Sequence, residues 1–333
     1  MKKIMFMLVA VAAMASSCTQ SDVIGLSSDD NVEIRVTAGI TSAVSPSTRA
    51  VVDGMINSGF TTDLDVAFVR ADEGVAAYGD YGGTALVGTV AHAGKTLSFA
   101  PAEYYLVSGK KTKLIGWYPR RSGVSYTQGT RVVDFGEIDG KTDLMATVLY
   151  EGSKGTKISS ITFNHLLTQF SIKVYAPDAA AQGLWGTVSS IKIAEKKQTC
   201  TITLPAATET ANTAAAPTFT GNSDLDLVKT DLTTSPATIT YPLTLGVGTA
   251  ANAAQAGYAM FAPQTAGNVV LKIELSSGVT QTVNVPVPTT PTPAGFLHGH
   301  AYEITLKFSS SAITPTVSVV DWVPVTNTPE VEI

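Results

Sequence analysis

Cysteine and charge are both scarce in this chain of 333 residues. Its two cysteines exclude a disulfide framework and a cysteine-rich metal site. Charged residues make up 15% of the sequence, against about 25% in an average domain, while the hydrophobic content is an ordinary 44%. This combination is the opposite of the disordered signature. The net charge of −5, without an extended basic cluster, argues against nucleic acid as a partner.

Nucleotide-binding and catalytic motifs are also missing. The sequence has no glycine-rich dinucleotide motif after a strand, no P-loop and no G-x-S-x-G nucleophile elbow. His298 and His300 would share one face of a strand, but no third ligand stands at a useful spacing. The carboxylates are scattered near turns, where aspartate is common. We therefore expect no enzyme, and no metal or cofactor site.

The N-terminus carries an export signal. Lys2 and Lys3 precede an apolar run at 4–15, which is shorter than the roughly 20 residues that span a bilayer. The following Ala15-Ser16-Ser17-Cys18 resembles the lipobox of bacterial lipoproteins, without its usual leucine. That resemblance implies removal of residues 1–17 and acylation of Cys18. Ordinary signal cleavage beside an incidental cysteine is the alternative.

The second cysteine then stands alone. Cys200 lies in the strand-like run 199–202, and no matched base accompanies it. A lone cysteine in such a run is more often a small buried hydrophobe than a nucleophile. We therefore expect a structural role for Cys200.

Alternation of apolar and polar residues dominates the rest of the chain, and this period of two indicates half-buried strands. The alternating segments are 64–70, 113–118, 143–149, 157–163, 170–174, 189–194, 199–204, 237–245, 271–275, 283–287, 302–308 and 316–320. Because no helical pattern separates these segments, we expect an all-β fold of sandwiches or barrels. The length predicts two domains. The Ala/Thr-rich stretch 205–217 is expected to be an exposed connection.

The most informative segment is a strand followed by a polar loop. Residues 41–50 contain Pro46 and Arg49 and are typical of loops that proteases cut. Cleavage between Arg49 and Ala50 would release the anchor and the first strand together, leaving a groove that another strand could fill. A permanent first strand beside an ordinary arginine is the alternative. The inward-facing residues of the strand are Val32, Ile34, Val36, Ala38 and Ile40.

Several short motifs, in order along almost the whole chain, resemble the fimbrillin-like (Mfa-like) lipoproteins of Bacteroidetes. After the lipobox they are Ser47-Thr48-Arg49-Ala50, Glu103-Tyr104-Tyr105, the segments 114–119, 163–172 and 299–306, and Asp321-Trp322. The resemblance implies two transthyretin-like β-sandwich domains in tandem, at 50–157 and 158–333, after the signal peptide 1–17 and an anchored prosegment 18–49.

The same resemblance implies a subunit of type V pili. Such a subunit is exported to the cell outer membrane as a surface-exposed lipoprotein by the lipoprotein-processing machinery. An arginine-specific protease cuts it, here after Arg49, and it joins other pilin subunits in the fimbrium by strand addition. Adhesion to surface glycans or proteins would be its role.

Two questions stay open in the sequence. Residues 323–333 could be a donor strand or a last edge strand, since Pro324 and Pro329 each lack a backbone donor. Stalk, tip and anchor roles are therefore all possible. The alternative function is a permanently anchored, glycan-binding surface lipoprotein, for which Trp185, between two glycines in an expected loop, is the best exposed aromatic.

Overall fold

The computed structural model describes residues 31–40, 63–230, 237–289 and 292–320. Nearly all of the regular secondary structure in these residues is strand, which confirms the predicted all-β fold. The described part has one α-helix, α1 (Ala179–Trp185), and one 3-10 turn, η2 (Ala250–Asn252). None of its helices is long and apolar enough to cross a membrane. Cys18, Arg49, Ala50 and the tail 323–333 lie outside the described residues.

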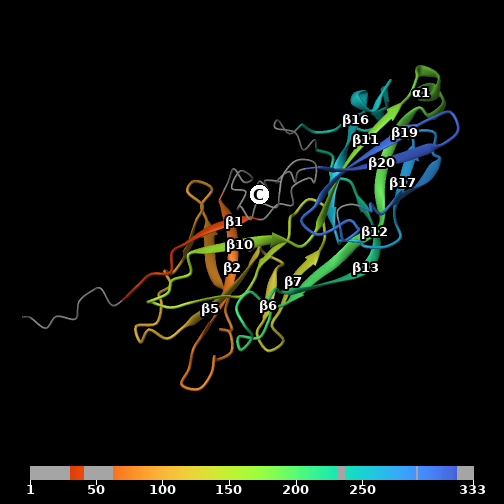
Figure 1. Cartoon of the computed structure of the whole chain (residues 1–333). Coiled ribbons are helices and arrows are strands. Elements are labelled where there is room, and N and C mark those ends of the chain that lie inside the picture. Colours follow the sequence, from red (N-terminus) through yellow and green to blue (C-terminus); the bar gives the residue numbers. More distant parts are fainter. Residues whose placement is uncertain (1–30, 41–62, 231–236, 290–291, 321–333) are drawn as a thin grey trace, which may run out of the picture. The chain divides into compact units, whose positions relative to one another are not determined.

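The first sheet has eight strands, which are shown at the lower left of Figure 1. In spatial order they are β2 (Leu64–Asp72), β3 (Leu86–Val90), β4 (Thr96–Phe99), β1 (Val36–Ile40), β10 (Ser160–His165), β8 (Met145–Thr147), β5 (Thr112–Tyr118) and β9 (Tyr150–Gly152). Strand β2 also pairs with β5, from Ala67 opposite Trp117 to Asp72 opposite Thr112. This extra pairing closes seven of the strands, all but β9, into a ring.

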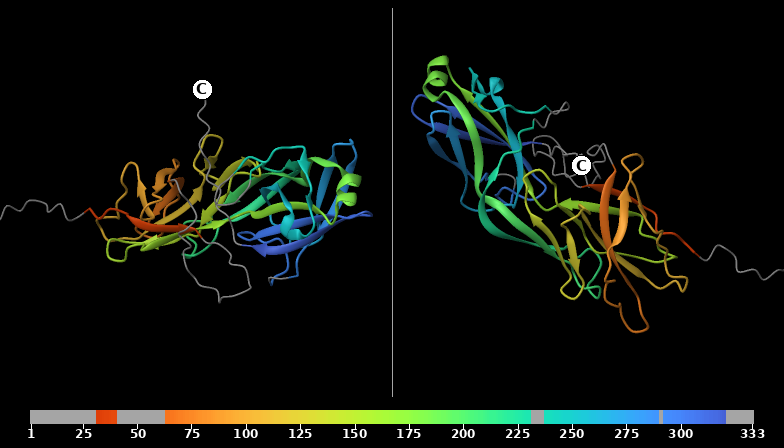
Figure 2. Two further views of the ribbon diagram at one scale, coloured as in Figure 1. Left: turned by 90° about the horizontal axis from the view of Figure 1, so that it is seen from above. Right: turned by 180° about the vertical axis from the view of Figure 1, so that it is seen from behind.

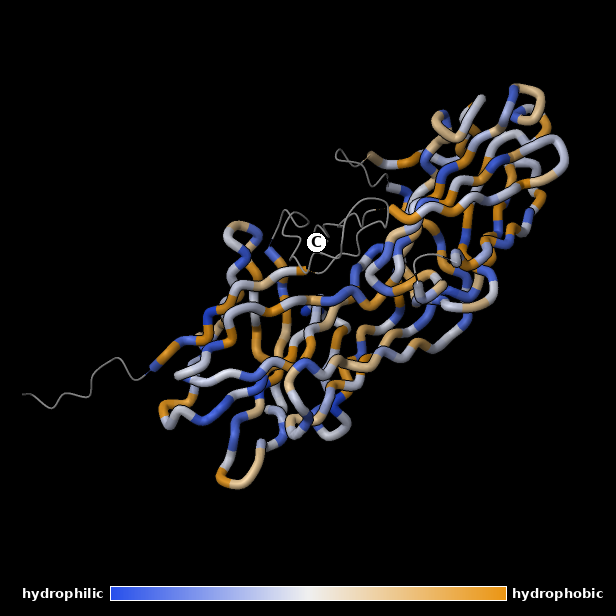
Figure 3. Tube along the Cα trace, in the orientation of Figure 1, coloured by the Kyte–Doolittle hydropathy of each residue, from blue (hydrophilic) through white to orange (hydrophobic). Residues whose placement is uncertain are grey.

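Alternation along β2 explains why both faces of this strand are buried. Val66 and Phe68 point into a core inside the ring, whereas Ala67 and Val69 belong to a second core on the other side. Phe68 anchors the inner core, with its ring edge-on to Phe99 at a centroid distance of 5.4 Å. Figure 3 shows the resulting alternation of hydrophobic and hydrophilic residues along the strands.

Two further sheets pack face to face around a third core. The five-stranded sheet consists of β15 (Gly246–Val247), β11 (Thr168–Ala176), β19 (Ala301–Phe308), β20 (Ile313–Val320) and β16 (Ala254–Phe261). The seven-stranded sheet consists of β18 (Thr280–Pro286), β17 (Asn268–Leu275), β12 (Thr187–Thr203), β7 (Val132–Glu137), β6 (Ser125–Thr127), β13 (Ala216–Asp226) and β14 (Leu243–Thr244). The core between them contains Phe170, Ile191, Leu271 and Ile304.

Strand β12 links this sandwich to the second core. The sequence predicts two strands, 189–194 and 199–204, but the structure forms a single strand of 17 residues. Its register shifts between Ile193 and Lys197, and Glu195 adopts a left-handed conformation with φ of 58°. The first half pairs with β17 and the second half with β7, so β12 serves both groups of strands. Figure 2 shows the long green strand in two further views.

Two local expectations were wrong. Trp185 ends helix α1 instead of lying in a loop. The segment 237–245 forms only the two-residue strand β14, with one isolated bridge at Thr238. The connection 205–217 is exposed over most of its length, as expected, although Ala207 and Ala215 are buried. The ammonium group of Lys113 donates to the carbonyl oxygens of Ala207 and Glu209 and holds this connection against β5.

Candidate strand-exchange site

Strand β1 uses both of its backbone edges inside the ring. On one side it runs parallel to β10, from Thr37 opposite Ser160 to Ile40 opposite Phe163. On the other side it runs antiparallel to β4, with Val36 opposite Leu97. Strand β1 is therefore an internal strand whose two neighbours are far from it in sequence.

The side chains of β1 and the residues before it alternate between core and surface. Ile34 and Ala38 are fully buried and Val36 is 2% exposed, all three in the core inside the ring. Arg35 and Thr37 between them are exposed. The alternation predicted from the sequence is thus present in the folded chain, and its flanking members, Val32 and Ile40, are half-buried.

A loop from elsewhere in the sheet extends this pairing toward the N-terminus. The Ile34 N–H donates to the carbonyl of Glu103 at 2.7 Å, and the Tyr105 N–H donates to the carbonyl of Val32 at 2.9 Å. Glu33 and Tyr104 form an antiparallel bridge between these two bonds. The loop 103–105 therefore holds the residues that precede β1.

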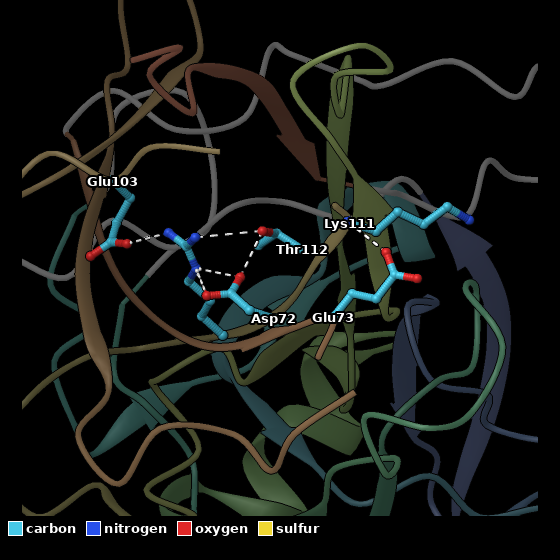
Figure 4. Close-up of polar contacts among 6 residues, drawn as sticks. Asp72, Glu73, Glu103, Lys111 and Thr112 are labelled. Atoms are coloured by element: carbon cyan, nitrogen blue, oxygen red, sulfur yellow. Dashed lines mark hydrogen bonds and ion pairs between the residues drawn. The ribbon is translucent and has the colours of Figure 1, made fainter. Parts of the chain in front are cut away.

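A polar cluster fixes this loop to β2 (Figure 4). Arg70 Nη1 donates to Glu103 Oε2 at 2.7 Å, and Arg70 Nε donates to Asp72 Oδ1 at 3.0 Å. The Thr112 hydroxyl donates to the same Asp72 oxygen at 2.7 Å. The side chains of Arg70 and Glu103 are each 17% exposed, so solvent screens this ion pair less than a surface pair.

A second polar cluster is centred on Glu151 in β9, the strand that pairs with β5. Lys111 Nζ donates to Glu151 Oε1 at 2.6 Å, and the Tyr78 hydroxyl donates to the other carboxylate oxygen at 2.8 Å. The hydrogen bond from Lys111, followed by that from Tyr78, holds the pKa of Glu151 below its ordinary value despite partial burial. Glu151 is therefore ionised at neutral pH and ties β9 to the loops before β5.

The remaining candidate residues have structural surroundings. Cys200 is fully buried, and burial raises the pKa of its thiol to about 12, so it carries no thiolate at neutral pH. His165 Nδ1 lies 2.6 Å from Asp143 Oδ2, and both side chains are buried at the end of β10, which favours a structural role. Over the described ranges, no group of three or more His, Cys, Asp or Glu side chains could hold a metal ion.

Trp185 is not an open aromatic platform. Its indole N–H donates to the carbonyl of Ser309 at 2.6 Å, and its ring packs edge-on against Phe308. The side chain is half-buried beside the third core, between the five- and seven-stranded sheets. This geometry favours a packing role for Trp185.

Sequence reasoning found β1 but missed the groups that hold it. The motif Glu103-Tyr104-Tyr105 was recognised only as a resemblance, and Arg70 was noted only as the end of an alternating run. No local pattern links Arg70 to Glu103, because 33 positions separate them in the sequence. The closed ring brings them together.

Comparisons with known proteins agree with this fold. A protein-family model described as fimbrillin-like matches residues 48–322. A solved structure of a proposed cell adhesion protein from Bacteroides uniformis is 19% identical, with a TM-score of 0.54, over 88% of this chain and 100% of that one. A proposed cell adhesion protein from Bacteroides ovatus is 16% identical, with a TM-score of 0.53, over 88% of this chain and 98% of that one. The search of curated proteins found no match.

Proposed function

This chain belongs to the fimbrillin-like family, which supports a cell-surface pilus or adhesin subunit, and we propose that it is a lipoprotein precursor that assembles by strand exchange. In this proposal Cys18 carries the lipid and the chain is displayed at the outer membrane. Cleavage between Arg49 and Ala50 frees residues 18–49. A strand from another subunit then replaces β1 in the fimbrium. Fimbrillin-like proteins are a structural and adhesive family and not an enzyme family.

The observation that carries the proposal is the internal position of β1 in a closed ring. A closed ring has no free edges. Loss of β1 would expose the facing edges of β4 and β10 at once, with a gap two inter-strand spacings wide, about 10 Å. A single extended segment fits such a gap and can bond to both edges.

The core inside the ring would also favour binding of a replacement strand. Ile34 and Val36 occupy positions among Phe68, Leu97 and Phe163. Burial of such side chains contributes about 1.5–3 kcal/mol each. Without β1 this apolar lining would face water, so a donor strand with alternating apolar residues would be bound strongly. After cleavage at Arg49, β1 itself would be held only by noncovalent contacts.

Cleavage by an arginine-specific protease tests the proposal. The purified chain should yield a product that begins at Ala50, lose residues 18–49 and form ladders on electrophoresis and filaments under the electron microscope. The matched control is Arg49→Lys, which keeps the charge but removes the arginine-specific site, and should stay monomeric. A product cut after Arg49 that keeps β1 bound and remains monomeric would contradict strand exchange.

The donor strand needs a separate test. A chain that lacks residues 323–333 should still be cut after Arg49. If the tail is the donor, this shortened chain will form no filaments, whereas an edge-strand role leaves filament formation intact. An uncut chain that stays monomeric and binds glycans would instead support the permanently anchored lipoprotein.

A further inference from the structure

Three linked loops include the one that pairs with the start of the described chain. They are 73–78, 104–111 and 153–157, which we call the anchor-side loops. The Tyr105 N–H bonds to the carbonyl of Val32, and the Tyr105 hydroxyl accepts a hydrogen bond from the Ile158 N–H at 2.8 Å. Lys110 Nζ donates to the carbonyl of Gly74 at 2.6 Å. These contacts link the three loops to one another and, through Tyr105, to the start of the described chain, which is red at the left of Figure 1.

The anchor-side loops expose apolar side chains to solvent. Val75 is fully exposed, and Val107 is 57% exposed. The two loops that carry these valines are joined by two hydrogen bonds. Lys110 Nζ donates to the Gly74 carbonyl, and the Lys111 N–H donates to the Glu73 carboxylate. Two unburied valines on neighbouring loops are suited to shallow insertion into an apolar phase.

Positive charge accompanies these valines. Two of the three nearby acids are paired with cations, Glu103 with Arg70 and Glu151 with Lys111, while Glu73 accepts a hydrogen bond from the Lys111 N–H. Lys110 donates to a carbonyl instead of a carboxylate, and Lys157 is exposed without an ionic partner among the described residues. The loops therefore offer basic groups to an anionic surface.

The length of chain before the described part points to what covers these loops. Thirteen positions separate Cys18 from Asn31, and a fully extended chain covers about 3.5 Å per residue, or about 45 Å in all. A lipid on Cys18 would keep this side of the ring within that reach of a bilayer. We propose that the anchor-side loops are a membrane-docking surface, which contacts anionic lipid headgroups through Lys110 and Lys157 and inserts Val75 and Val107 between them.

This inference rests on the proposed lipidation of Cys18 for its biological setting, but the surface itself can be tested without the lipid. Docking through these loops alone is weak and reversible, because stable membrane attachment needs a second signal, here the lipid on Cys18. Cleavage after Arg49 would remove that second signal and release the subunit. The surface would thus orient the precursor and not the assembled fibre.

Fluorescence quenching by lipid tests the insertion. Cys200 is fully buried, so a thiol-reactive fluorophore labels an introduced Val75→Cys or Val107→Cys selectively in a mature-length Cys18→Ser chain. The probe is a vesicle of phosphatidylglycerol and phosphatidylethanolamine that contains brominated acyl chains. We expect quenching at positions 75 and 107. The control is Val279→Cys, a valine 48% exposed in the turn between β17 and β18, which should stay unquenched.

Charge reversal tests the electrostatic part. Lys110→Glu together with Lys157→Glu should weaken vesicle binding at least about tenfold, since each basic residue near an anionic surface contributes about fivefold. The matched control reverses Lys141 and Lys307, which are exposed elsewhere, and should leave binding unchanged. Equal quenching at positions 75 and 279, no quenching at positions 75 and 107, or equal effects of the two charge reversals would overturn the proposal.

Acylation of Cys18 needs a separate measurement. Mass measurement of the exported chain reports whether Cys18 is acylated. An unmodified Cys18 would contradict the proposed lipoprotein, whereas vesicle docking by the Cys18→Ser chain would still stand. Conversely, an acylated chain whose labelled loops remain unquenched would keep the lipoprotein and refute the docking surface.

Discussion

Arg70 and Glu103 join strand β2 to the loop that pairs with the residues before β1. Their side chains meet at 2.7 Å, while the backbone carbonyl of Glu103 accepts the N–H of Ile34. One residue thus bonds to the permanent wall of the ring through its carboxylate and to the proposed prosegment through its backbone. The stability of this connection should influence how firmly β1 is held.

Removal of the Glu103 charge should loosen the segment before β1. Glu103→Gln weakens a partly buried charge-assisted hydrogen bond, so we expect a loss of about 1–2 kcal/mol in the free energy of unfolding. Hydrogen exchange at the Ile34 amide should become faster. The control is Glu33→Gln, whose partner Arg35 is 66% exposed, and which should cost less than about 0.5 kcal/mol. Unchanged exchange at Ile34 in Glu103→Gln would contradict this role.

Truncation of a buried side chain just before β1 should destabilise the uncut chain. Ile34→Ala removes a fully buried side chain from the core inside the ring. We expect a loss of about 2–5 kcal/mol, measured by chemical denaturation. Arg35→Ala, one position away on the exposed face, should change stability by less than about 1 kcal/mol. Similar effects of the two substitutions would mean that the segment before β1 does not contribute its inward face to the core.

The ring also depends on a glycine in β5. A Cβ at Gly116 would lie 2.5 Å from Cε1 of the buried Phe68. Gly116→Ala should therefore cost about 1–3 kcal/mol, because the Phe68 ring must shift within a packed core. Gly129 has no atom within 4 Å of an added Cβ, so Gly129→Ala is the matched control and should be near neutral in thermal denaturation.

Burial of Cys200 makes the folding stability of the chain decrease with pH in the alkaline range. Its pKa is raised to about 12 in the folded chain from an ordinary value of 9.0. Above pH 9 the unfolded chain loses the thiol proton while the folded chain keeps it, so folding stability falls as pH rises from about 9 to about 12. The slope from this group reaches about 1.4 kcal/mol per pH unit.

The variant Cys200→Ala should remove this slope. Comparison of denaturation curves between pH 9 and 11 measures the difference from the parent chain. A thiol-alkylating reagent at pH 7.5 should modify Cys200 only after unfolding. Rapid alkylation of the folded chain would show that the thiol is accessible, contrary to its burial.

The sequence by itself determined the fold class and most of the strands. Period-two patterns report which side of a strand faces the core, and this is a local property. The predicted strands 271–275 and 283–287 are present as β17 and β18, which pair as a hairpin from Asn268 opposite Pro286 to Glu274 opposite Thr280. The alternation of Ile34, Val36 and Ala38 was likewise readable, because each residue needs only its own neighbours to show the pattern.

Only the tertiary structure decided which strands pair and what holds them. The closure of the ring by β2 and β5, the place of β1 between β4 and β10, and the bond from Arg70 to Glu103 all join distant residues. The two predicted strands 189–194 and 199–204 imply a break between them, yet β12 continues through it, because a local register shift lets both halves keep their partners. Pairing energy between distant strands leaves no periodic signal in either strand, so the proposed exchange site could be located only in the folded chain.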